Sequence, residues 1–282
     1  MLAIDPASAY ICGITGSGPF RLQAPVAESG RAPACKAESI MDAQNPNRAS
    51  AHPNHVIATL TPNDFELLGP HLKPFELVHE DLLFDAGETV NWAYFPHSGV
   101  ISLVVGLADG QLIEAAMVGR DSLVGGSAAM DGKVSLNRGI VQVAGMASIL
   151  DVDVLRDVAE KSPAFRTTLI RHEQALFAQA QQSAACNASH SVESRLARWL
   201  LRTRDLTGGD KLELTQEFLA QMLGVRRTSV SLVANTLQSA GFIRYSRGHV
   251  QILNLDGLRE TSCECYETVK AHNDRLIGNG PK

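Results

Sequence analysis

The sequence predicts an α+β protein with an antiparallel, jelly-roll-like β-roll, a long helix and a C-terminal winged helix–turn–helix, in that order. Three observations support this fold class. Six short apolar runs separated by turn signals lie between residues 76 and 143, which is typical of an antiparallel roll. After residue 151 the apolar pattern changes to three- and four-residue steps, which are typical of helices. Residues 214–255 then show two short helical patterns, a glycine between them and a hairpin behind them.

The charge is unevenly distributed along the 282 residues. From His190 to Asn254 there are nine Lys and Arg and five Asp and Glu, a net of +4; the remaining residues carry sixteen and twenty-five, a net of −9. A positive module on an acidic body favours local contact with phosphates. There is no long apolar run, so we expect no membrane partner. The five cysteines are odd in number and no secretory apolar region precedes them, so we expect a cytoplasmic protein without a disulfide framework.

We expect five segments. Residues 1–55, rich in Ala, Pro, Gly and Ser, are interpreted as a disordered extension, and Met41 would head a plausible shorter reading frame. The others are a β-roll sensor domain at 56–160, a dimerisation helix at 161–190, a winged helix–turn–helix at 191–256, and a C-terminal helix and tail at 257–282. Regular structure is expected from about Thr61, which caps a helix with Pro62 at its first position.

The expected strands of the roll are separated by Asp-Gly and Gly-Glu turn signals. They are Glu76–His79, Leu82–Phe84, Trp92–Phe95, Val100–Leu107, Leu112–Val118 and Ile140–Val143.

The long helix opens at Ser162-Pro163 and runs to about Asn187. One set of its residues recurs at alternating four- and three-residue steps, as in the seam of a coiled coil. These predicted dimerisation residues are Phe165, Leu169, His172, Leu176, Gln179, Ser183 and Cys186. A second stripe with Ile170 and Phe177 is expected to pack on the roll. The alternative is a helix that packs only against its own domain.

The helix–turn–helix pattern begins at Thr215, a good N-cap, and Gly224 supplies a left-handed residue for the turn. The second helix, from about Arg226 to Ser239, has an apolar stripe on one side and polar residues on the other. This side is expected to enter the major groove of DNA. The hairpin turns around Arg247-Gly248, as a wing would. The simpler alternative is a helical hairpin with a solvated basic face.

With the roll, the long helix and the winged module in this order, the chain resembles the Crp/Fnr family of bacterial transcription regulators. The motifs are Asp85-Ala-Gly-Glu88, the stretch from Tyr94 to Ser102, and Leu214–Leu237. The resemblance implies a homodimer that reads a palindromic operator in two successive major grooves of double-stranded DNA. In such regulators an effector in the roll acts through the dimer helix. RNA polymerase is a further partner that the resemblance suggests.

The expected effector site departs from the members that bind cyclic nucleotides. Those members carry a Gly-Glu pair whose carboxylate holds the ribose, and an Arg that clamps the cyclic phosphate. Here the matching place reads Val124-Gly-Gly-Ser-Ala128, without the acid, and Arg138 lies in the later segment. A cyclic nucleotide is therefore not expected. Cys12 and Cys35 do not form the cysteine cluster of the oxygen-sensing branch. Two alternatives stay open: haem, with histidines available in the roll, and redox sensing through Cys186. Those histidines are His71, His79 and His97.

The reading helix also departs from the family. Typical members present Arg, Glu and a second Arg where this chain has Arg227, Thr228 and Leu232. An Arg can donate two hydrogen bonds to guanine, and a Leu contacts a thymine methyl, so a different half-site is expected. Phosphate contacts are expected from residues at the ends of both helices and in the wing. The predicted DNA-binding residues are Thr215, Gln216, Arg226, Arg227, Thr228, Ser229, Ser231, Leu232 and Arg247.

We expect neither an enzyme nor a metal protein. Cys263-Glu-Cys265 is the only close cysteine pair; joined by Cys186 or His272 it would offer metal ligands, but a single Cys-x-Cys is weak evidence. Two rival functions remain: a cupin-like small-molecule-binding protein, which needs a His and Glu ligand cluster in the roll, and a winged-helix protein that binds a protein partner without specific DNA readout.

Overall fold

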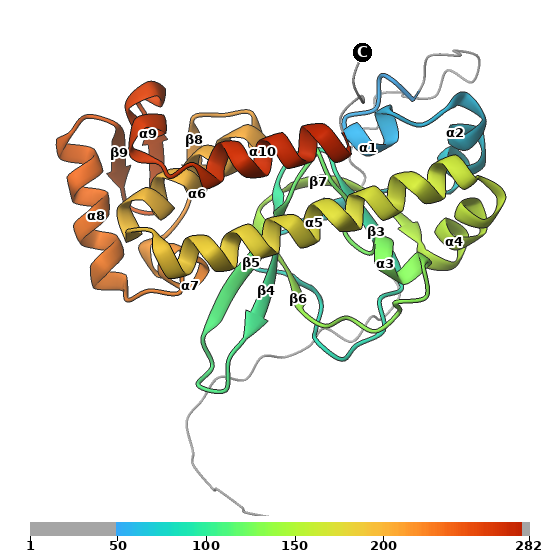
Figure 1. Ribbon diagram of the computed structural model, residues 1–282, viewed down its shortest axis with the longest axis horizontal. Coiled ribbons are helices and arrows are strands. Elements are labelled where there is room, and N and C mark those ends of the chain that lie inside the picture. Colours follow the sequence, from blue (N-terminus) through green and yellow to red (C-terminus); the bar gives the residue numbers. More distant parts are fainter. Residues whose placement is uncertain (1–48, 278–282) are drawn as a thin grey trace, which may run out of the picture. The chain divides into compact units, whose positions relative to one another are not determined.

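The computed structural model describes residues 49–277, which belong to one compact unit, Gln44–Lys282 (Figure 1). Most of the expected extension, residues 1–48 with Cys12, Cys35 and Met41, lies outside the described residues. The prediction is wrong for residues 49–55. Asn54 is fully buried, caps helix α1 (His55–Ala58), and donates through Nδ2 to the carbonyls of Pro96 and Ser122 at 2.9 and 2.8 Å. Regular structure therefore begins before Thr61.

The roll consists of two antiparallel sheets, as predicted. Their strand orders are β1-β7-β3 and β2-β6-β4-β5. The strands are β1 (Lys73–Leu77), β2 (Leu82–Phe84), β3 (Trp92–Pro96), β4 (Val100–Gly106), β5 (Leu112–Val118), β6 (Arg138–Val143) and β7 (Gly145–Asp151).

Two strands differ from the prediction. The first begins earlier, at Lys73, and includes Pro74; β1 pairs only with β7, so the missing N–H of this edge strand is harmless. Strand β7 was missed because only Ala144 separates it from β6, and no polar turn signal marks the boundary. It forms the centre of its sheet, between β1 and β3.

Short helices pack beside the roll. They are α2 (Pro62–Leu68), the 3-10 turn η1 (Gly69–His71), α3 (Gly126–Ala129) and α4 (Val152–Lys161). The Thr61 side chain caps α2 as predicted, with the N–H of Asp64 3.2 Å from its Oγ1. Apolar side chains of α1, α2 and α4 share a core with Phe165 and Leu169 from the start of the long helix.

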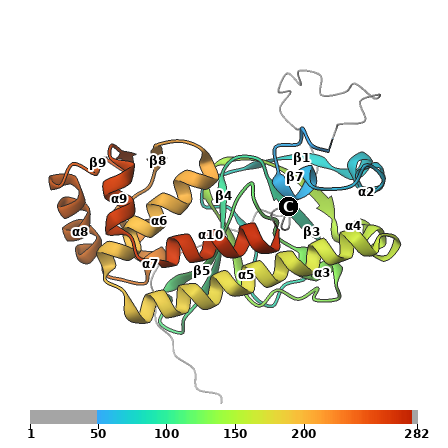
Figure 2. The same ribbon diagram turned by 45° about the horizontal axis from the view of Figure 1, so that its top comes forward.

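The long helix α5 (Pro163–Ser189) crosses the roll and packs on β5. The expected C-terminal helix is in fact two helices, α9 (Leu255–Thr261) and α10 (Cys265–Leu276), with a break at residues 262–264. Helix α10 returns along α5, and the two helices lie side by side in both views (Figures 1 and 2).

The C-terminal module follows α5 directly. Helix α6 (Val192–Thr207) leads to a three-stranded sheet of order β8-β10-β9, which carries the wing. Its other elements are β8 (Lys211–Glu213), α7 (Gln216–Leu223), α8 (Arg227–Ser239), β9 (Ile243–Ser246) and β10 (His249–Ile252).

One hydrophobic core joins this module to the roll. It includes Val104 and Met117 from the roll and Trp199 and Leu200 from α6. At this junction the buried Glu114 carboxylate accepts a hydrogen bond from Trp199 Nε1 at 3.1 Å, and its Oε2 lies 2.5 Å from Ser102 Oγ. Burial raises the pKa of Glu114 to about 7. No helix among residues 49–277 is long and apolar enough to cross a membrane.

Candidate DNA-binding site

Two short helices and a glycine turn build the candidate reading head. Thr215 caps α7: its Oγ1 accepts from the N–H of Phe218 at 3.1 Å. Gly224 ends α7 with φ of +61°, a conformation that costs glycine little. Arg226 is the N-cap of α8, and its extended backbone leaves its side chain exposed at the start of the helix. The helix–turn–helix is thus confirmed with the bounds that the sequence predicts.

Helix α8 has one buried and one free side. Val230, Ala234 and Leu237 are at most 2% exposed and fix the helix on the module's core. The opposite side exposes Arg227, Thr228 and Leu232, with Leu232 69% exposed. In both views α8 lies at the outer edge of the C-terminal module (Figures 1 and 2). An apolar side chain this exposed, beside two arginines, suits a surface that contacts bases.

Side-chain contacts of the reading head separate direct candidates from supporting residues. Ser231 Oγ donates to Gln216 Oε1 at 2.6 Å, so these two side chains join α7 to α8. Arg227 Nε lies 3.9 Å from Glu217 Oε2, an exposed pair worth little energy in water. Arg227 is therefore held loosely and free to turn toward a base.

The wing turn places Arg247 at its tip. Arg247 has φ of +46° and Gly248 has φ of +83°, as in a two-residue hairpin of type I′. An exposed Arg is an uncommon choice for a left-handed position, where Asn and Gly are preferred. Tyr245 supports the wing: its hydroxyl donates to the Leu214 carbonyl at 3.1 Å, and its N–H donates to Gln238 Oε1 at 2.7 Å.

The predicted DNA-binding residues all belong to this head, although no DNA contact is tested. Six of them are exposed, and three are partly buried. The exposed ones are Thr215, Arg226, Arg227, Thr228, Leu232 and Arg247; the partly buried ones are Gln216, Ser229 and Ser231.

The two sides of α5 are exchanged relative to the prediction. The expected seam faces the chain's own interior: six of its residues are buried and Leu176 is partly buried. Gln179 Nε2, for example, donates to the Met117 carbonyl at 3.3 Å. The residues of this predicted seam, which we no longer assign to a dimer face, are Phe165, Leu169, His172, Leu176, Gln179, Ser183 and Cys186. Ile170 and Phe177, expected against the roll, are instead 43% and 66% exposed. Sequence reasoning failed here because both sides of α5 repeat at three- and four-residue steps.

The place that would hold a cyclic phosphate is occupied by the protein's own charges. Arg138 donates to Asp85 Oδ1 at 2.5 Å, and this hydrogen bond holds the pKa of Asp85 below its usual value. At the glycine pair a Cβ on Gly126 would lie only 2.8 Å from Glu173 Oε1, a carboxylate that α5 supplies. An anionic ligand would have to displace Glu173 and compete with Asp85.

The histidines considered for haem lie apart. His79 Nδ1 is 2.9 Å from the Gln142 carbonyl, whereas His97 Nε2 is 2.9 Å from Ser148 Oγ and its ring contacts His52. His71 lies in η1. The only group of three or more potential metal ligands among the described residues is elsewhere: Cys186, His190, Cys263 and Cys265. The sequence offered Cys186 or His272 as partners of the Cys-x-Cys pair; the structure selects Cys186 and adds His190.

Comparisons with known proteins agree with this geometry. A family model described as the Crp-like helix–turn–helix domain matches residues 194–261. FixK2 from Bradyrhizobium japonicum has a TM-score of 0.59 at 15% identity, covering 68% of this chain and 98% of FixK2. A putative Crp/Fnr-family regulator from Eubacterium rectale has a TM-score of 0.55 at 17% identity, covering 72% and 94%.

The regulator CLP from Xanthomonas campestris is similar in the same way, with a TM-score of 0.55 at 15% identity over 67% of this chain and 98% of CLP. No curated protein matches the sequence. The similarity in structure spans the roll, the long helix and the reading head, and the family model covers the reading head itself. The chain thus has the fold of these Crp/Fnr regulators, and residues 194–261 match the Crp-like helix–turn–helix domain.

Proposed function

We propose that this chain is a homodimeric transcription regulator that reads a palindromic DNA operator through α8. The observation that carries the proposal is the free side of α8, with Arg227 and Leu232 exposed beside Arg226 in a Crp-like helix–turn–helix. Arg227 would donate to a guanine, Thr228 would bond either way, and Leu232 would contact a thymine methyl. Thr215, Gln216, Arg226 and Arg247 would position the module on phosphates, with Ser229 and Ser231 as supporting contacts.

The dimer face proposed here is the exposed side of α5. Ile170, Phe177 and Ala184 are seven residues apart, and polar or small residues fill the positions between them: Thr167, Gln174, Gln181 and Ala188. Together these seven exposed residues, here named the outer stripe, follow the alternating three- and four-residue steps of a coiled-coil seam. A second copy of α5 is the natural occupant, because a two-fold axis along this helix gives two reading helices for a symmetric operator.

The effector of this regulator would not be a cyclic nucleotide. The support is the self-filled site, in which Arg138 pairs with Asp85 and the Glu173 carboxylate lies against the glycine pair. A contact with RNA polymerase stays a prediction, since no surface of the described residues identifies it.

The test is selection from a randomised pool of double-stranded DNA by the purified full chain at two salt concentrations, followed by sequencing. We expect a palindrome whose half-site centres lie about one helical turn, ~34 Å, apart. Retention that depends on salt without any motif would contradict sequence-specific readout. A folded dimer that retains no DNA would favour the alternative in which the winged helix binds a protein partner. A chain that binds a small molecule but no DNA would favour the cupin-like alternative.

A further inference from the structure

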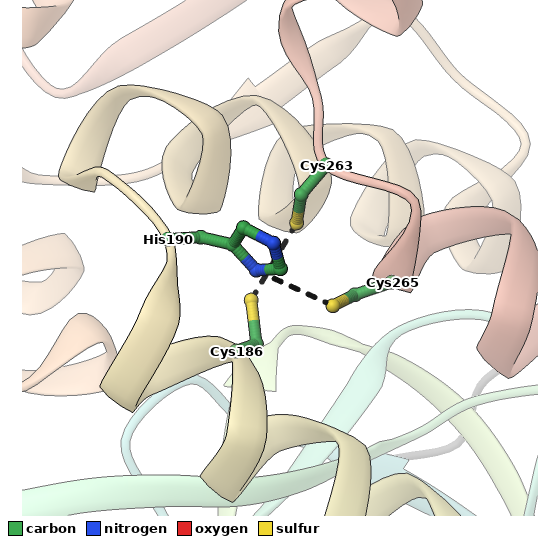
Figure 3. Close-up of side chains that lie close together, drawn as sticks. All are labelled: Cys186, His190, Cys263 and Cys265. Carbon is green, nitrogen blue, oxygen red and sulfur yellow. Dashed lines mark hydrogen bonds between the residues drawn. The ribbon is translucent and has the colours of Figure 1, made fainter.

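Three cysteines and a histidine meet at the junction of the long helix and the reading head. Cys186 lies in the last turn of α5, and His190 is the residue that ends this helix. Cys263 lies in the break between α9 and α10, and Cys265 is the first residue of α10, with Glu264 between them. In Figure 3 the three sulfur atoms surround the imidazole of His190. The four ligands thus come from two chain segments that only the fold brings together.

The distances fit one tetrahedral ion. Cys186 Sγ is 3.5 Å from Cys263 Sγ, Cys265 Sγ is 3.6 Å from His190 Nδ1, and the four ligand atoms lie within 4.8 Å of one another (Figure 3). Zinc with bonds of about 2.3 Å to sulfur separates two tetrahedral sulfurs by roughly 3.8 Å. A zinc ion would therefore require shifts of only a few tenths of an ångström to about one ångström.

The surroundings of the cluster resemble the outer contacts of a metal site. His190 faces the thiols with Nδ1, while its Nε2 lies 3.2 Å from Glu264 Oε1. A carboxylate in this position fixes the ring orientation and makes the free nitrogen a better ligand. Gln182 Nε2 donates to Cys265 Sγ at 3.0 Å, a hydrogen bond that the sulfur can also accept when it binds a metal ion. Ordinary packing of buried cysteines explains neither contact.

Two buried arginines of α6 supply the charge that such a site needs. Arg195 and Arg198 are 7% and 8% exposed, and their Nε atoms have no hydrogen-bond partner within residues 49–277. Burial raises the pKa of the Cys186 thiol, and the nearby charge of Arg198 opposes this shift. Burial lowers the pKa of Arg195, and the nearby Cys186 and Cys263 oppose that shift. Three thiolates, a neutral imidazole and a divalent ion carry a net charge of −1. This charge would compensate buried guanidinium groups that are otherwise costly.

We propose that Cys186, His190, Cys263 and Cys265 bind one zinc ion in a closed tetrahedral site that fastens the C-terminal helix α10 to the junction of α5 and α6. The three cysteines are at most 7% exposed, which leaves no open position for a substrate and favours a structural ion. The ion would join the end of α5, the two-residue link between α5 and α6, and the segment that leads into α10. It would thereby hold the direction in which the reading head leaves the long helix.

The first test measures metal content of the full chain, without DNA. Protein purified under reducing conditions with zinc should hold one zinc per chain, with an apparent Kd below about 50 nM against a chelating dye. Cobalt in its place should give the strong visible absorption and sulfur-to-metal charge transfer of a tetrahedral thiolate site. Cys186→Ser and Cys263→Ser should lose the ion, whereas the control Cys12→Ser/Cys35→Ser should keep it. Wild-type protein without bound zinc, or with weak cobalt absorption typical of six oxygen ligands, would overturn the proposal.

A second variant tests the site even if the cysteine variants fail to fold. Glu264 is 74% exposed in its side chain, so Glu264→Gln should fold normally and still bind one zinc at saturation, but 10- to 100-fold more weakly. Glu260→Gln, an exposed acid on α9, is the matched control and should leave zinc affinity unchanged. Equal affinities in the two variants would contradict the assigned role of His190 and Glu264.

A disulfide is the competing outcome. The 3.5 Å between Cys186 Sγ and Cys263 Sγ is far from the ~2.05 Å of a bond, but a small movement would close it. Alkylation under rapid acid quenching, followed by mass spectrometry, distinguishes the two. Modification of Cys186, Cys263 and Cys265 after zinc removal supports the ion, and a Cys186–Cys263 disulfide in the quenched protein overturns it.

The consequence for DNA rests on the proposed function and is measured separately. Removing zinc should lower affinity for the selected operator at least tenfold, and adding zinc back should restore it. Zinc binding with unchanged operator affinity would leave the metal site intact and refute only its coupling to the reading head, whereas absence of any operator would concern the proposed function alone.

Discussion

Helices α5 and α8 both bury one side in this chain, but their free sides differ in kind. The free side of α8 carries Arg227 and Thr228 around a single leucine, a surface suited to phosphates and base edges. The free side of α5 carries Ile170 and Phe177, while its buried side holds polar residues such as Gln179. Two large apolar side chains exposed on one side of a helix are not accounted for by one chain alone. We therefore propose that α8 binds a polyanion and that α5 binds a second protein surface.

Phe177→Glu should produce the largest effect, because it places two charges within the outer stripe of a dimer. We expect a monomer in analytical ultracentrifugation and at least a 100-fold loss of operator affinity, since the two reading heads would no longer bind together. Leu136→Glu is the matched control: it makes the same kind of change at a side chain of the roll that is 90% exposed. A Phe177→Glu protein that stays dimeric would refute the outer stripe as the dimer face.

Replacing the two neighbouring arginines at the start of α8 should affect DNA binding in different ways. Arg227→Ala should cost about 1–3 kcal/mol for the cognate guanine and relax the preference at that base pair. Arg226→Ala should weaken binding to all sequences alike and reduce the salt dependence by about one charge per head. Titration of cognate and single-mismatch duplexes at several salt concentrations separates the two. If both variants lose affinity uniformly, Arg227 contacts phosphate and not a base.

The same comparison explains what the sequence could predict. In α8 the buried residues Val230, Ala234 and Leu237 are apolar and the free residues are polar apart from Leu232, so pattern and burial agree. In α5 the stripe with His172 and Gln179 is buried because the roll and α10 cover it, and neither contact leaves a local signal. The order of roll, long helix and reading head was therefore predictable, but the direction in which α5 faces was not.

Two further features were hidden for the same reason. Asn54 looks like part of a polar leader, yet its side chain bonds to the carbonyls of Pro96 and Ser122, far along the chain. His190 is distant in sequence from Cys263 and Cys265, and no spacing rule connects them. Such contacts depend on the return of α10 along α5, which local patterns do not specify.

The third prediction, with the smallest expected effect, concerns Glu114 at the junction between the roll and α6. Its titration reports on how tightly the reading head packs against the roll. Its pKa in the folded state, about 7, lies above the usual 4.5 of a glutamate, so the folded state binds more protons than the unfolded state between these values. The free energy of unfolding should therefore fall as pH rises from about 4.5 to 7, by about 1–3 kcal/mol from this group. Glu114→Gln keeps an acceptor for Trp199 Nε1 and should remove most of this pH dependence.

Urea unfolding at pH 5.5 and pH 8 measures this change, with Glu76→Gln, an exposed acid of β1, as control. We expect the wild-type protein and the control to lose stability between the two pH values, and Glu114→Gln to lose at least about 1 kcal/mol less than they do. Equal pH dependence in all three proteins would mean that Glu114 titrates normally and that water reaches the junction between the roll and α6. Such access would imply that the reading head, with α8, separates from the roll more readily than α5 does. Helices α5 and α8 would then differ in mobility as well as in the chemistry of their exposed sides.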